Sequence, residues 1–116
     1  MEYTLSKSQV LIEFESSEFI LKTQRQIAKN LALLSISVDT VFLDNILTYD
    51  SILLSLEPQL AELMKASEQQ FLHYLYLVDL PEIEFLNLLN DPEFLPKISE
   101  LILKREAYKV YLRAKY

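Results

Sequence analysis

Apolar side chains recur along most of this chain at the three- and four-residue spacing of one face of an α-helix. The most regular stretch covers about residues 58–78, where apolar or small positions fall alternately four and three residues apart. Pro58 suits the first turn of such a helix, because the backbone N–H that proline lacks has no partner there. This stretch therefore predicts one long helix beginning at Pro58.

The same spacing predicts four further helices, at about residues 17–36, 40–56, 79–90 and from 96 nearly to the C-terminus. Three of them are preceded by a polar residue that suits the cap of a first turn. The candidate caps are Ser16 with Ser17, Asp39, and Asp79, which would form an aspartate version of a capping box with Glu82.

The first sixteen residues carry two patterns at once. Val10, Ile12 and Phe14 alternate as in a strand, whereas Val10, Leu11 and Phe14 suit a helical turn equally well. No other segment offers a partner strand. We therefore expect residues 1–16 to form either a short helix or a loosely ordered arm.

The absence of glycine from all 116 residues strengthens the helical prediction. Ordinary usage of roughly 7% would supply about eight glycines, and hairpin turns depend on them. The absence also excludes a Walker loop and a dinucleotide-binding fingerprint, since both require glycine. We expect an all-α fold: a single domain over residues 1–116, built as a compact bundle of four to five helices, mostly antiparallel, with short loops.

Two of the predicted helices, the last one and the end of the one at 58–78, are apolar on more sides than one core contact requires. In the last helix, Leu101, Tyr108 and Leu112 form one stripe, and a second stripe lies roughly 140° away. Such a helix is either central in its own bundle or also faces a partner. We expect a partner, most simply a second copy in a two-fold dimer. The second stripe consists of Leu103, Ala107, Val110 and Ala114. The candidate interface residues are Phe71, Tyr74, Tyr76, Leu77, Leu101, Tyr108, Tyr111 and Leu112.

Charge is unevenly distributed along a chain whose net charge is −6. Residues 39–96 contain eleven acidic side chains and one basic one, Lys65, whereas residues 97–116 contain six basic and two acidic ones. The acidic middle serves solubility, or it attracts a basic partner or mimics nucleic-acid phosphates. The overall acidity disfavours nucleic-acid binding.

The basic tail nevertheless supports an alternative function. Arg105, Lys109 and Arg113 stand four residues apart beside tyrosines that are able to stack on bases, so this stripe suits a nucleic-acid-associated regulator. The same cations also suit a helix C-terminus, where they interact favourably with its dipole, or ion pairs with the acidic middle. A second basic row, consisting of Lys22, Arg25 and Lys29, is interpreted as the solvent side of its helix.

No constellation of reactive residues accompanies these surfaces. His73 is the only histidine, and the nearest acids in the sequence, Glu68 and Asp79, lie off its helical face. The chain contains no cysteine and no metal-binding motif, so we expect no catalytic residue, no metal and no cofactor. No small-molecule substrate is evident either.

The location predicted from the sequence is the cytoplasm. The first residues lack the basic start and apolar run of a signal peptide, and nowhere do 18 apolar residues follow one another. The leading hypothesis is therefore a non-enzymatic, cytoplasmic protein that acts by docking apolar helix faces on a protein partner or on itself.

Overall fold

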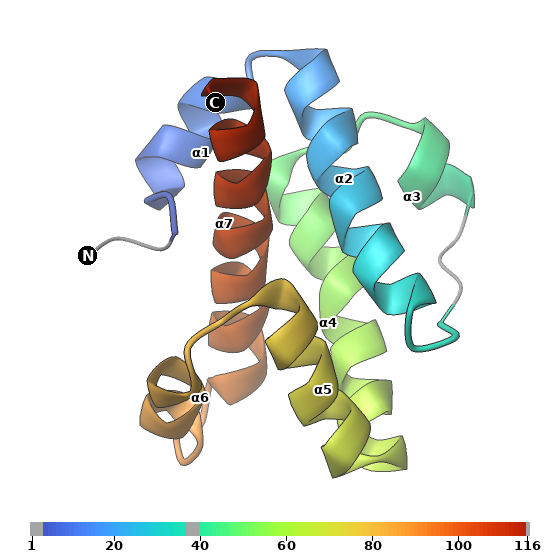
Figure 1. The fold of residues 1–116 in the computed structure, drawn as a ribbon, viewed down its shortest axis with the longest axis vertical. Coiled ribbons are helices and arrows are strands. Elements are labelled where there is room, and N and C mark those ends of the chain that lie inside the picture. The colour runs from blue at the N-terminus through green and yellow to red at the C-terminus, as the bar shows by residue number, and fades with distance from the viewer. Residues whose placement is uncertain (1–3, 37–39, 116) are drawn as a thin grey trace.

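The computed structural model describes residues 4–36 and 40–115, which form seven helices and no strand. The all-α prediction is confirmed (Figure 1). Four of the helices have more than ten residues, and the others are short, so the described part holds more elements than the four or five expected. The helices are α1 (Lys7–Glu13), α2 (Ser17–Ala32), α3 (Thr40–Asp44), α4 (Tyr49–Ala66), α5 (Glu68–Val78), α6 (Glu82–Leu88) and α7 (Phe94–Lys115).

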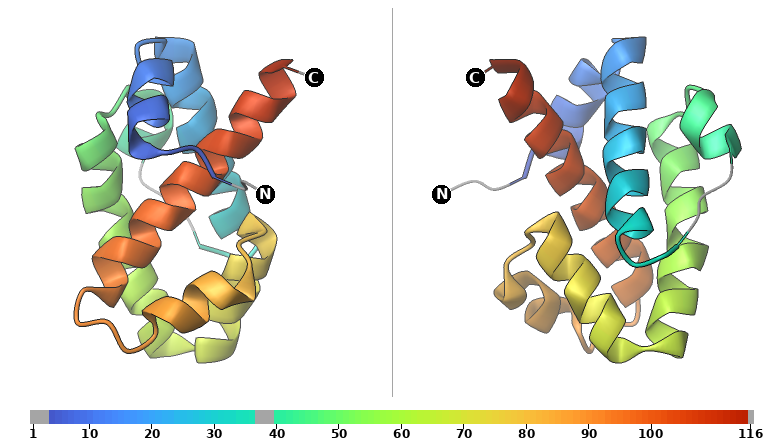
Figure 2. Two further views of the ribbon diagram at one scale, coloured as in Figure 1. Left: turned by 90° about the vertical axis from the view of Figure 1, so that its left-hand side faces the viewer. Right: turned by 45° about the vertical axis from the view of Figure 1, so that its right-hand side comes forward.

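Helix α7 is the central element. It packs against α1, α2, α4, α5 and α6, whereas Figure 1 shows α3 on the far side of α2 and Figure 2 shows α7 crossing one face of the bundle. A partly buried hydrogen bond between α4 and α7 adds to the apolar packing, since the Tyr49 hydroxyl donates to Glu100 Oε2 at 2.7 Å. Burial and this carboxylate raise the pKa of Tyr49. The mostly antiparallel arrangement of the bundle stays a prediction.

The middle of the chain divides differently from the expected 40–56 and 58–78 helices, and both of these predictions are wrong. Helix α3 ends at Asp44. Helix α4 begins at Tyr49 and is capped by Thr48, whose hydroxyl accepts a hydrogen bond from the Ser51 N–H. Helix α4 then continues through Pro58. The break comes at Ser67, whose extended backbone and side chain cap α5. The capping preference of Ser67 thus breaks the helix, although the apolar spacing continues across this residue.

The proposed capping box at Asp79 and Glu82 is also wrong. Asp79 ends α5 in a left-handed conformation with φ 66°, and Pro81 precedes α6 without a side-chain cap. Ser16 does cap α2, as predicted, because its hydroxyl accepts from the Phe19 N–H. The other candidate, Asp39, lies outside the described residues.

Of the two alternatives for the N-terminal segment, a short helix or a loosely ordered arm, the structure has the short helix, α1. Ser6 and Gln9 make a reciprocal capping box, in which each side chain accepts a hydrogen bond from the other residue's backbone N–H. Val10 then inserts into the core. Helix α1 packs against α7, so this segment covers part of the central helix.

Buried Gln24 fixes the link between α3 and α4. Its side-chain amide donates to the carbonyl groups of Phe42 and Asn45 and accepts from the Leu47 N–H. The fully buried polar side chain is therefore satisfied by three backbone groups of the link. A single glutamine of α2 thus positions a segment about twenty residues away.

The buried apolar side chains form one continuous cluster. The Cα radius of gyration is 13.4 Å, which agrees with the roughly 13 Å expected for a compact chain of this length. The accessible surface of 6973 Å² is close to the value of about 6,600 Å² expected for a monomer of this mass. Total area alone therefore gives no sign of a missing partner. Within the described ranges, no helix combines the length and apolarity needed to cross a bilayer.

Candidate functional site

The structure separates the eight candidate interface residues into three groups. Phe71 and Tyr74 belong to the core, with 1% and 0% of their surfaces exposed, so neither is available to a partner in this conformation. Tyr76 is 78% exposed. The remaining five are half-buried: Leu77, Leu101, Tyr108, Tyr111 and Leu112.

The two apolar sides of α7 are mostly used within the chain. Leu103, Ala107 and Val110 of the second stripe are buried, and Leu101 packs at the edge of the core. This is what a helix surrounded by five others requires. The two-sided pattern of α7 therefore reflects its central position and gives no evidence of a partner.

Five of the eleven large apolar side chains that are exposed in the described residues lie on α5, α6 and the residue after α6. We call this set the α5–α6 face. It consists of Leu72, Tyr76, Ile83, Leu86 and Leu89. A groove of about 280 Å³ joins the two helices between Leu72, Tyr76 and Phe85. Glu82 stands at its edge, and Asp79 is exposed nearby in the chain, so acidic groups accompany the apolar centre.

Three aromatic rings support this face from below. Phe71 of α5, Phe85 of α6 and Phe94 of α7 have ring centroids 5.8 to 6.3 Å apart. These spacings are typical of favourable aromatic pairs. Phe71 therefore packs α6 against α5 from inside the core. The packed rings of Phe71, Phe85 and Phe94 fix the two helices that carry the α5–α6 face.

The proposed nucleic-acid stripe is largely used for internal contacts. The Arg105 guanidinium pairs with Asp79 at 2.7 Å and its Nε donates to the Val78 carbonyl, while Lys109 Nζ donates to the Leu77 carbonyl at 3.2 Å. Those carbonyls end α5, where four C=O groups lack helical partners. Arg105 and Lys109 therefore cap α5 from the side of α7.

Lys109 also pairs with a fully buried carboxylate. Its Nζ lies 2.9 Å from Glu106 Oε1, and Asn30 Nδ2 of α2 donates to Glu106 Oε2 at 2.7 Å. Burial raises the pKa of Glu106 to about 7, although Lys109, Asn30 and Arg113 all favour its ionised form. Burial, and Glu106 after it, raise the pKa of Tyr74, whose hydroxyl has no hydrogen-bond partner within the described chain.

Sequence reasoning missed Glu106, although a signal was present. It stands four residues from both Ile102 and Val110, so an acidic residue occupies a buried apolar stripe of α7. An acid at such a position is rarely fully buried unless it is paired. The partners come from Asn30 on another helix and Lys109 on the same one, and the first of these depends on tertiary packing.

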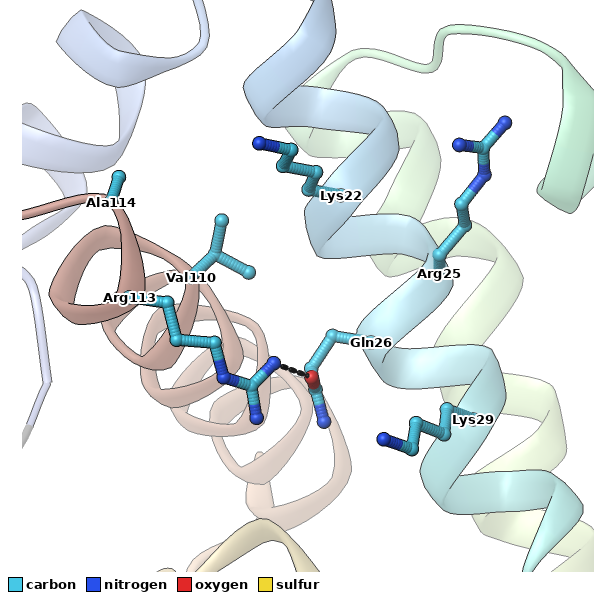
Figure 3. Close-up of a pocket in the computed structure, with 7 residues that line it drawn as sticks. All are labelled: Lys22, Arg25, Gln26, Lys29, Val110, Arg113 and Ala114. Atoms are coloured by element: carbon cyan, nitrogen blue, oxygen red, sulfur yellow. Dashed lines mark hydrogen bonds between the residues drawn. The ribbon is translucent and has the colours of Figure 1, made fainter.

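The third member of the stripe, Arg113, faces α2. Its guanidinium donates to Gln26 Oε1 across a groove between the two helices (Figure 3). We call this the α2–α7 groove, and its volume is about 360 Å³. The second basic row of the sequence lines its other side. The lining residues are Lys22, Arg25, Gln26, Lys29, Val110, Arg113 and Ala114.

His73 lies on the exposed side of α5, with its ring 6.5 Å from that of Tyr76. Across residues 4–36 and 40–115, no group of three or more His, Asp or Glu side chains is arranged to hold a metal ion. Its contact with Tyr76 places His73 at the border of the α5–α6 face.

A comparison of the chain with protein families, curated proteins and solved structures finds no match.

Proposed function

We propose that this is a non-enzymatic interaction protein that docks another protein on the α5–α6 face. The observation that carries the proposal is the set of five large, exposed apolar side chains on and just after two neighbouring helices, of which Leu72 and Tyr76 line one groove. Contiguous exposed apolar surface commonly marks a binding site. Tyr76 is the most exposed of the five and has the amphipathic ring that is enriched among residues contributing most to interfaces.

A second copy of the chain is the first partner we propose, in a two-fold dimer as expected from the sequence. The proposed interface differs from the one predicted from the sequence, because Phe71 and Tyr74 are buried in the core and α7 contributes little exposed apolar surface. Acidic groups at the face would repel each other across a two-fold axis, and salt screens such exposed charges. Self-association should therefore strengthen with salt, whereas docking of a basic partner should weaken with it.

The test compares two apolar-to-acidic substitutions at exposed sites. Tyr76→Asp places a charge at the centre of the face, and Leu54→Asp makes the same kind of change on α4, outside the face. Light scattering across micromolar concentrations should give a dimeric mass for the wild type and Leu54→Asp, and a monomeric mass for Tyr76→Asp.

A monomeric wild type at both low and high salt would exclude self-association. A heterologous protein partner would then be sought by pull-down from native lysate with and without nuclease, using Tyr76→Asp as the negative bait. Equal recovery by wild type and Tyr76→Asp would contradict docking on the α5–α6 face. We place this activity in the cytoplasm, in keeping with the cysteine-free sequence.

Nucleic-acid association through the α7 stripe is the second proposal, with less support. Arg105 and Lys109 already bind the end of α5, so binding there would have to displace both contacts. A labelled oligonucleotide that shows no mobility shift at low salt removes this function, since phosphate contacts are strongest there.

A further inference from the structure

The α2–α7 groove combines features of a ligand site that neither basic row suggested alone. Its walls carry Lys22 and Lys29 from α2 and Arg113 from α7 (Figure 3). Val110 and Ala114 form an apolar part of the lining, and the volume of about 360 Å³ falls in the range of small-molecule sites. Arg25 belongs to the lining but extends toward α3, away from the other cations.

No carboxylate lines this groove. Within the described ranges, Lys29 and Arg113 have no acidic group within ion-pairing distance, and Lys22 pairs only with Glu18, in a contact where both side chains are exposed. Such an exposed pair contributes little and is readily exchanged for another anion. In a chain of net charge −6, three cations therefore line one concave surface whose lining contains no carboxylate.

The Arg113 side chain is positioned by a hydrogen bond to α2. Its guanidinium donates to Oε1 of Gln26, a residue that is itself buried, and Gln26 lies between Arg113 and Lys29. A guanidinium offers five N–H donors, so one bond to Gln26 leaves others for an acceptor in the groove. The buried carboxylate of Glu106, one turn before Val110 on α7, is already bound by Asn30 and Lys109.

We propose that the α2–α7 groove binds a small ligand that carries two or more linked phosphate groups, through Lys22, Lys29 and Arg113. Guanidinium groups bind phosphate in bidentate geometry, and lysine ammonium groups add compact point charges. Cations on both walls match an extended anion better than a single phosphate. The apolar lining leaves room for an organic group beside the phosphates. The inference is independent of the α5–α6 face.

The test titrates the full-length ¹⁵N-labelled protein with inorganic pyrophosphate at low ionic strength. We expect saturable amide shifts confined to residues 22–29 and 110–114. Lys29→Gln and Arg113→Gln should each weaken the affinity about tenfold, as expected for loss of one charge-assisted contact. The matched control is Lys65→Gln, which removes the same charge from the last turn of α4 and should leave the affinity unchanged. Circular dichroism verifies that each variant is folded.

Two further probes define the ligand. Sodium sulfate at matched ionic strength should give no saturable shifts at the groove. Adenosine diphosphate that binds more tightly than pyrophosphate identifies a nucleotide as the ligand, and equal affinity identifies the phosphate chain alone, so both results support the site.

Three results would overturn the proposal. One is the absence of saturable shifts at millimolar pyrophosphate. Another is an equal loss of affinity in Lys65→Gln, which would indicate non-specific charge attraction. The third is tight binding of a single-stranded oligonucleotide at these residues with no response to pyrophosphate, which would make the groove a nucleic-acid site.

Discussion

At the residue scale, the most consequential side chain is the fully buried Glu106. Burial raises its pKa to about 7 from an ordinary value of 4.5, even though Lys109 and Asn30 contact its two oxygens. The free-energy cost of removing the carboxylate from water is thus larger than the stabilisation that its partners give to the ionised form. Protonation of Glu106 should therefore be linked to folding.

The free energy of unfolding should fall as the pH rises from about 4.5 to about 7, because the folded protein then holds a proton on Glu106 that the unfolded chain has lost. The shift corresponds to roughly 3 kcal/mol across this window. Urea unfolding of wild type and Glu106→Gln at several pH values measures the effect.

The difference between the two proteins isolates Glu106, because all other titrating groups are common to both. Glu106→Gln should lack the decline attributed to this residue. Parallel pH profiles for the two proteins would show that the buried carboxylate is not linked to folding.

At the element scale, the chain ends helices without the residue that usually does so. Helices α2 and α5 both finish in Schellman motifs, in which the Ile36 N–H donates to the Leu31 carbonyl and the Leu80 N–H to the Leu75 carbonyl. The residue that must turn left-handed is Ser35 in one and Asp79 in the other, with φ of 62° and 66°. Glycine usually takes this position because a Cβ atom makes it costly.

Ser35→Gly should therefore raise the free energy of unfolding by about 1 kcal/mol, since it removes the left-handed penalty. Ser35→Ala is the control, because it deletes the hydroxyl but keeps the Cβ atom. Thermal and urea unfolding should rank the glycine variant above both the wild type and the alanine variant. Equal stability of the glycine and alanine variants would contradict a penalty at this position.

At the scale of the whole molecule, α7 organises the fold. Five helices pack on it, and Leu103, Ala107 and Val110 of its second apolar stripe are buried. Burial on two sides accounts for the pattern that led us to predict an interface there. The surface that we propose for a partner is the α5–α6 face, where five large apolar side chains stay exposed.

Leu103→Ala should accordingly cost about 2–5 kcal/mol of unfolding free energy, the range for truncation of a fully buried leucine. Leu112→Ala, at a half-buried position of the same helix, should cost clearly less. Urea unfolding of both variants gives the comparison. A mild effect of Leu103→Ala would mean that α7 is not enclosed by its own chain.

The sequence by itself determined the helical class and much of the local structure. Periodicity and the absence of glycine predicted the all-α fold, and Ser16 marked the start of α2. The last helix was placed to within two residues of its start at Phe94. These features depend on neighbours in the sequence, so local preference suffices to predict them. Local preference misled at Ser67, where a cap interrupts a continuous apolar pattern, and at Asp79, which ends α5 instead of capping α6.

Only the tertiary structure decided which surfaces are covered and which charges are used. Spacing shows that Leu103 and Val110 share one side of a helix, but not which other helix covers that side. It likewise cannot show that Arg105 and Lys109 bind the end of α5, or that Arg113 meets the basic row of α2. The reason is physical: an apolar side or a cation takes its role from the group packed against it, and distant parts of the chain supply that group.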